Sequence, residues 1–106
     1  MKSKFKNCPS EGGFDAYRKC KNHIVVKLHI PETAEREDAT GHSFICDEAE
    51  VICFCNYAGE EIPEICGGYL IQGSEENAHF IRKGQLLTEE MRLRFFTRFQ
   101  DALNGW

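Results

Sequence analysis

The stretch Ile24-Val25-Val26-Lys27-Leu28-His29-Ile30-Pro31 decides the fold class. β-branched residues dominate it, and from Val26 onward apolar residues alternate with Lys27 and His29. This alternation is typical of a strand that turns one face to a core. Pro31 has no backbone N–H to donate, so it ends the strand. The sequence therefore predicts a β-strand over residues 24–30.

Further strand-like runs lie on both sides of this stretch. We predict strands at 17–20, 44–57 with a break at Asp47-Glu48, 69–72 and 79–82, with Asn22 in the first connection. In the run 49–57, alternation places Val51, Cys53, Cys55 and Tyr57 on one face and Ile52 and Phe54 on the other. A strand apolar on both faces is covered on both sides. The charged residues 32–40 form either one helical turn or an acidic loop.

The C-terminal region shows helical periodicity. Thr88 is a suitable N-cap, and one stripe at helical spacing holds Met91, Phe95, Phe99, Ala102 and Leu103. The fold expected is α+β: a small, mainly antiparallel sheet of about five strands with this C-terminal helix packed on one face. The Phe-rich stripe has a second interpretation, as an interface for a homo-oligomer or a partner.

A chain of 106 residues has the size of one domain. We expect a flexible basic arm at residues 1–7, with Lys2, Lys4 and Lys6, followed by a single domain over 8–106. The arm precedes no apolar run, so we do not expect it to act as a secretory signal. No apolar stretch approaches the roughly 20 residues that a membrane helix needs. These features favour a cytoplasmic protein.

The net charge of −4 conceals an asymmetry. Residues 1–30 carry a net charge of +5, residues 31–64 carry −9, and the remainder is neutral. The acidic segment argues against direct nucleic-acid binding, because it repels phosphates. Its acidic side chains either solubilise the protein or bind a basic protein partner. The candidate partner-binding residues are Glu32, Glu35, Glu37, Asp38, Asp47 and Glu48.

The six cysteines point to three kinds of chemistry. Without an export signal we expect reduced thiols that pack as small hydrophobic groups. A zinc site would draw on Cys46, Cys53, Cys55 and Cys66, but a second Cys pair at zinc-finger spacing is missing, so we expect no metal and no cofactor. A catalytic thiol would best be Cys66, before Gly67-Gly68, with His23, His29, His42 or His79 as base.

The order of several residues resembles a known family. The matching pattern comprises Cys8-Pro9, Gly12, Phe14, Tyr17-Arg18-Lys19, the strand 24–31, Ala34, Arg36, Ala39-Thr40 and Ala49-Glu50-Val51. It resembles the domain of unknown function appended to pentapeptide-repeat proteins of bacteriophages and their Firmicute hosts, over about residues 8–52. That family's basic cluster is replaced here by Ser43, Phe44 and Ile45. Its closing segment is matched only in part, by His79-Phe80. The resemblance implies a phage or prophage origin and transfers no catalytic residue.

Together these observations predict a small phage-encoded binding protein without enzymatic activity. It would act on a host protein, such as a nucleic-acid-handling defence enzyme, through its acidic surface and in the cytoplasm of the bacterial host. A cysteine- or metal-dependent small enzyme is the alternative.

Overall fold

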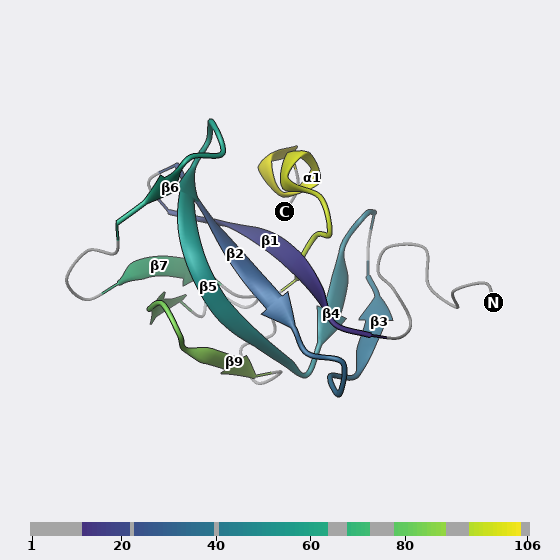
Figure 1. The fold of residues 1–106 in the computed structure, drawn as a ribbon. Helices are drawn as coiled ribbons and strands as arrows, with labels where there is room; N and C mark the ends of the chain where they lie inside the picture. Colours follow the sequence, from purple (N-terminus) through teal and green to yellow (C-terminus); the bar gives the residue numbers. More distant parts are fainter. Residues whose placement is uncertain are drawn as a thin grey trace.

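The computed structural model describes residues 12–21, 23–39, 41–63, 68–72, 78–88 and 94–104. Its elements are β1 (Phe14–Cys20), β2 (Ile24–Ile30), β3 (Arg36–Asp38), β4 (Phe44–Cys46), β5 (Glu48–Asn56), β6 (Glu61–Ile62), β7 (Tyr69–Gln72), β8 (Ala78–Ile81), β9 (Leu86–Thr88) and α1 (Phe99–Asn104) (Figure 1). The expected basic arm, residues 1–7, lies outside the described residues, as do Cys8 and Cys66.

One antiparallel sheet organises the chain. Its strand order is β1-β2-β5-β6, and β9 pairs with β5 as the fifth strand. The predicted strand at residues 24–30 is β2, and it lies between β1 and β5 with Pro31 just beyond its end. The turn from β1 to β2 uses His23 at φ 63°. Asn22, which the sequence favoured for that turn, lies outside the described residues.

A bulge in β5 changes which faces its side chains occupy. The pairing with β2 shifts between Lys27 and Leu28, so that Lys27 is opposite Cys53 and Leu28 is opposite Val51. One extra residue in a strand reverses the alternation on its far side. Val51 therefore lies on the core face with Phe54, whereas Cys53 lies on the other face. The sequence was therefore wrong to place Val51 on the face of Cys53 and Cys55, but right to place Phe54 on the opposite face from those two cysteines.

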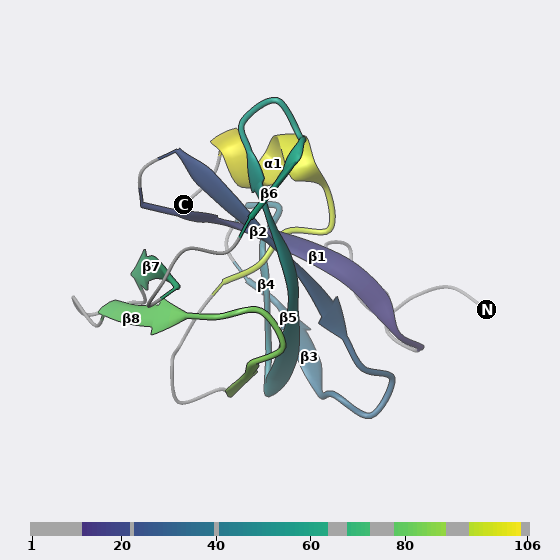
Figure 2. The same cartoon turned by 60° about the vertical axis from the view of Figure 1, so that its left-hand side comes forward.

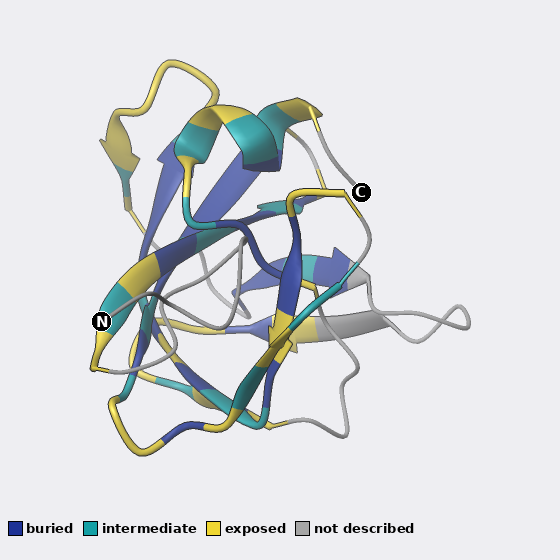
Figure 3. Ribbon diagram, turned by 90° about the vertical axis from the view of Figure 1, so that its right-hand side faces the viewer, coloured by how far each residue is buried: buried dark blue, intermediate teal, exposed yellow. Residues whose placement is uncertain are grey.

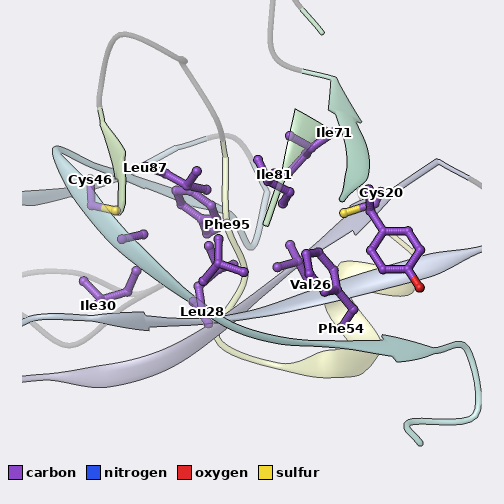
Figure 4. Packing of buried hydrophobic residues seen from close by; sticks show 14 of the residues in the cluster. Cys20, Val26, Leu28, Ile30, Cys46, Phe54, Ile71, Ile81, Leu87 and Phe95 are labelled. Atoms are coloured by element: carbon purple, nitrogen blue, oxygen red, sulfur yellow. The ribbon is translucent and has the colours of Figure 1, made fainter. Parts of the chain in front are cut away.

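The main core lies against one face of the sheet (Figure 4). Val26, Leu28 and Ile30 on β2 are completely buried there, next to Phe54 of β5. The β7–β8 hairpin and β4 cover them through Ile71, Ile81 and Phe44. Removing each such side chain from water contributes about 1.5–3 kcal/mol, so this cluster dominates the stability of the fold.

The segment before the last helix is extended and joins two sheets. Phe95 exchanges two backbone hydrogen bonds with Phe44 of β4, and Phe96 exchanges two with Tyr17 of β1. The sequence predicted a helix from Thr88, but Thr88 ends β9 opposite Glu48. The helix α1 begins only at Phe99. Extended backbone sends consecutive side chains to opposite sides, so Phe95 enters the main core and Phe96 faces α1.

The short helix α1 covers part of the other face of the sheet (Figure 2). Ala102 is fully buried there with Val25 and Phe96, and Tyr17 meets the Phe99 ring edge-on at 5.8 Å. The outer side of the helix is exposed (Figure 3). The predicted fold class, a mainly antiparallel sheet with a C-terminal helix on one face, is confirmed. Among the described residues, no helix has the length and apolar character needed to cross a membrane.

Residues 32–39, the described part of the segment 32–40, form neither a helix nor a continuous loop. A turn follows β2, and residues 36–38 then form β3, which pairs antiparallel with β4. Glu37 lies opposite Ile45 in this small sheet. Both sequence-based alternatives were therefore wrong for residues 36–38, since pairing with β4 imposes a strand on three residues of low β propensity.

Candidate functional site

The six predicted partner-binding acids lie at one end of the molecule, around β3 and β4. Glu32 and Glu35 belong to the turn after β2, and Glu37 and Asp38 belong to β3. Asp47 and Glu48 form the corner between β4 and β5. We call this set of six residues the acidic edge. Glu32, Glu35 and Glu37 are exposed, whereas Asp38, Asp47 and Glu48 are half-buried.

Hydrogen bonds fix the two halves of the acidic edge against each other. The N–H of Glu35 donates to Oδ1 of Asp47 at 2.8 Å, and the N–H of Asp47 donates to the carbonyl oxygen of Glu35 at 3.0 Å. The hydroxyl of Thr33 donates to Oε1 of Glu48 at 3.2 Å. Asp47 and Glu48 therefore build the corner, while the exposed carboxylates remain at its surface.

Arg36, the one basic residue between positions 31 and 64, points its guanidinium toward the backbone. The guanidinium donates to the carbonyl oxygens of Gly12 at 2.6 Å, Pro31 at 3.0 Å, Ala34 at 3.0 Å and Glu32 at 3.3 Å. Its central carbon also lies 5.0 Å from the centroid of the Phe14 ring. Arg36 therefore ties the turn after β2 to the start of β1. The sequence showed a lone base among acids but not this role.

An apolar side chain accompanies the acidic edge. Ile45 is 40% exposed, although its neighbours Phe44 and Cys46 are buried. Because directly opposite residues of an antiparallel pair share a face, Ile45 and Glu37 lie side by side on the outer face of β3–β4. Exposed apolar atoms beside charges are a usual composition for a protein–protein contact. The sequence analysis did not select Ile45.

The structure separates the cysteines that were considered for a metal site. Cys46 belongs to the main core with Cys20, and its Sγ donates to the carbonyl oxygen of Glu48 at 3.4 Å (Figure 4). Cys53 and Cys55 lie opposite Lys27 and Val25, on the other face of the sheet. The described ranges contain no group of three or more metal-ligating residues. Cys46 therefore cannot complete a zinc site with Cys53 and Cys55.

Two of the described thiols, those of Cys20 and Cys55, are poorly suited to nucleophilic attack. Burial raises the pKa of Cys20 to about 12. Burial, and then the neighbouring Cys53, raises the pKa of Cys55. A protonated thiol is a weak nucleophile, so neither residue fits a catalytic role at neutral pH. Cys66 and the side chain of His79, which belonged to that alternative, lie outside the described part of the chain.

A family model matches residues 4–80, which include the strands of the core up to β7 and the whole acidic edge. The chain belongs to this family, the family of unknown function DUF5758. The match extends well beyond residues 8–52, where the sequence pattern was recognised. It ends before β9 and α1, so the Phe95–Phe96 junction lies outside the matched region. No curated protein and no solved structure matches the chain.

Proposed function

We propose that this member of the DUF5758 family is a non-enzymatic binding protein that docks on a basic protein surface through its acidic edge. The observation that carries the proposal is the orientation of Arg36, which donates to backbone carbonyl oxygens while Glu32, Glu35 and Glu37 stay exposed. The lone base of the segment thus serves the fold, and carboxylates dominate the outward-facing surface.

The acidic edge has two properties that suit docking. Its backbone is held in place by the Glu35–Asp47 hydrogen bonds, so little ordering is required when a partner binds. Its negative field would steer a basic surface toward it, which raises the association rate and makes that rate sensitive to salt. Ile45, at 40% exposure, supplies apolar contact area beside the charges. This combination supports fast association followed by local apolar packing.

The resemblance to the domain appended to pentapeptide-repeat proteins of phages and Firmicutes suggests the finer proposal. We infer a phage or prophage protein that works in the cytoplasm of a bacterial host and inhibits a host protein. A nucleic-acid-handling defence enzyme is the partner class that fits, since its phosphate-binding channel is basic. The acidic edge would occupy that channel in place of nucleic acid.

Affinity capture with charge-reversed baits tests this proposal. The wild-type chain, an edge variant (Glu32→Lys, Glu35→Lys, Glu37→Lys) and a control variant (Glu50→Lys, Glu60→Lys, Glu61→Lys) are immobilised and incubated with bacterial lysate. Both variants change the net charge equally and alter exposed residues of the same acidic segment. Asp47 and Glu48 stay unchanged because their carboxylates accept hydrogen bonds from Glu35 and Thr33, which hold the acidic edge itself in place.

The proposal requires a partner that the wild type and the control variant retain and the edge variant loses. Equal retention by all three baits would exclude the acidic edge as the docking surface. Loss from both variants would reveal attraction by overall charge instead of a defined site.

A further inference from the structure

Two cysteines of β5 share one face of the sheet. Cys53 lies directly opposite Lys27, and Cys55 lies directly opposite Val25. Residues at i and i+2 of a regular strand point to the same side. The pairing irregularity comes before Cys53, so it does not disturb this pair. Both side chains therefore lie on the same side of β5, two residues apart, and burial followed by the neighbouring Cys53 raises the pKa of Cys55.

These two thiols are buried but lie outside both apolar clusters of the core. Cys20 and Cys46 lie within the main apolar cluster, but Cys53 and Cys55 lie in neither that cluster nor the one beneath α1. They remain 8% and 7% exposed and are free thiols. Packing alone therefore explains Cys20 and Cys46 better than it explains this pair.

We propose that Cys53 and Cys55 form a two-coordinate site for a thiophilic monovalent cation of the Cu(I) class. Soft thiolate ligands select Cu(I), whereas a structural zinc site needs four ligands. The described residues offer no group of three or more metal ligands, which matches the lower coordination number. Binding joins one ion to both Sγ atoms and releases one proton from each thiol to solvent. No electron is transferred.

The charges beside the pair give the site a testable signature. The complex of one monovalent cation with two thiolates carries a net charge of −1, which a neighbouring cation stabilises. Lys27 lies directly opposite Cys53 in the β2–β5 pairing, so its positive charge lies beside the pair. Glu61 lies directly opposite Cys55 in the β5–β6 pairing, so its negative charge lies beside the pair and repels the anionic complex. Lys27 therefore strengthens the site and Glu61 weakens it.

Anaerobic Cu(I) titration against a chromogenic chelator measures this affinity. The titrated protein carries Cys8→Ser and Cys66→Ser, so that binding is assigned to the described cysteines. We expect one Cu(I) per chain, with two sulfur neighbours by X-ray absorption. Cys53→Ser or Cys55→Ser should weaken binding by more than about 100-fold, because even outer-shell partners of a metal site cost 10–100-fold when lost.

Three control variants distinguish this site from nonspecific binding of Cu(I) to thiols. Cys20→Ala/Cys46→Ala removes two thiols from the core and should leave Cu(I) affinity unchanged. Lys27→Gln should lower the affinity and Glu61→Gln should raise it, each by up to about tenfold. These two charge variants keep both thiols, so they test the site even where a serine variant fails to fold.

Four results would overturn the proposal. The first is retention of Cu(I) by the Cys53→Ser/Cys55→Ser double variant, and the second is loss of binding when Cys8 and Cys66 are changed to Ser. The third is a change of Cu(I) affinity in the same direction for Lys27→Gln and Glu61→Gln. The fourth is tetrahedral binding of zinc in preference to Cu(I).

Discussion

Glu35 and Asp47 each donate a backbone N–H to the other residue, one to a carboxylate oxygen and one to a carbonyl oxygen. These two hydrogen bonds close the corner at which β3 and β4 meet the start of β5. They connect the turn after β2 to the beginning of β5, twelve residues further along the chain. The acidic edge therefore depends on a structural carboxylate as well as on the exposed ones.

Asp47→Ala should open this corner. The N–H of Glu35 loses its acceptor, and a lost hydrogen bond of this kind lowers the free energy of unfolding by about 0.5–1.5 kcal/mol. Asp47→Asn keeps Oδ1 and should lose less. Glu37→Ala, at an exposed carboxylate, should stay within about 0.5 kcal/mol of the wild type. Urea denaturation measures all three, and equal stabilities for Asp47→Ala and Glu37→Ala would contradict the role assigned to Asp47.

Side chains on the two faces of the C-terminal segment should contribute unequally to the free energy of unfolding. Phe95, 3% exposed, packs in the main core at 5.9 Å from the Phe44 ring, so Phe95→Ala should cost about 3–5 kcal/mol. Phe99 is half-buried against Tyr17, so Phe99→Ala should cost clearly less. Equal losses in thermal or urea unfolding would instead fit a single helix with both residues in one stripe.

Gly68 should tolerate no side chain. It has φ 77°, and a Cβ atom there would collide with the carbonyl oxygen of Ile81 on β8. Gly59 has φ 86° with open space around it, so it controls for backbone conformation alone. Gly59→Ala should cost about 1 kcal/mol, whereas Gly68→Ala should cost roughly 3 kcal/mol or more. Similar losses in urea denaturation would show that β7 can move away from β8.

Alkaline pH should lower the free energy of unfolding because the thiol of Cys20 is buried. Burial raises its pKa from 9.0 to about 12 in the folded state. Below pH 9 the thiol is protonated in both states, so its contribution to stability is complete. Above pH 9 the unfolded thiol ionises first, and that contribution is lost progressively up to about pH 12. The Cys20 share of the loss between pH 7 and pH 9.5 is about 1 kcal/mol.

The variant Cys20→Ala isolates this effect in urea denaturation at pH 7 and pH 9.5. It should lower the pH-dependent loss by about 1 kcal/mol relative to the wild type. Val26→Ala removes volume from the same cluster and keeps the thiol, so its pH-dependent loss should match that of the wild type. An unchanged loss in Cys20→Ala would mean that the thiol is not the group responsible. The comparison stops at pH 9.5 because burial also lowers the pKa of Arg18 to about 10, which acts in the opposite direction.

Local sequence patterns predicted a strand well where one of its faces packs against the core and the residue types alternate accordingly. The strand 24–30 has the predicted bounds, because alternation and Pro31 act within the strand itself. The bulge before Cys53 could not be predicted, since it arises from the pairing of β5 with β2. Phe95 shows a second limit. Its spacing to Phe99 fits a helix, but Phe44 and Tyr17 offer backbone partners that hold the segment extended.

The sequence was sufficient to predict which residues form the acidic edge but not how they are arranged. Charge counting identified Glu32, Glu35 and Glu37, and the fold joins Glu35 to Asp47 by two hydrogen bonds. No local pattern distinguishes the exposed carboxylates from that of Asp47, which accepts a hydrogen bond from the N–H of Glu35. The orientation of Arg36 depends on carbonyl oxygens of Gly12 and Pro31, which only the folded chain brings together.

The association rate with a captured partner, measured against salt concentration, tests the acidic edge most directly. For the wild type and the control variant (Glu50→Lys, Glu60→Lys, Glu61→Lys), we predict a rate that falls steeply as salt increases, as electrostatic steering requires. For the edge variant (Glu32→Lys, Glu35→Lys, Glu37→Lys), we predict a rate at least about tenfold lower at low salt and nearly independent of salt. An edge variant that keeps the wild-type rate and the wild-type salt dependence would contradict the account.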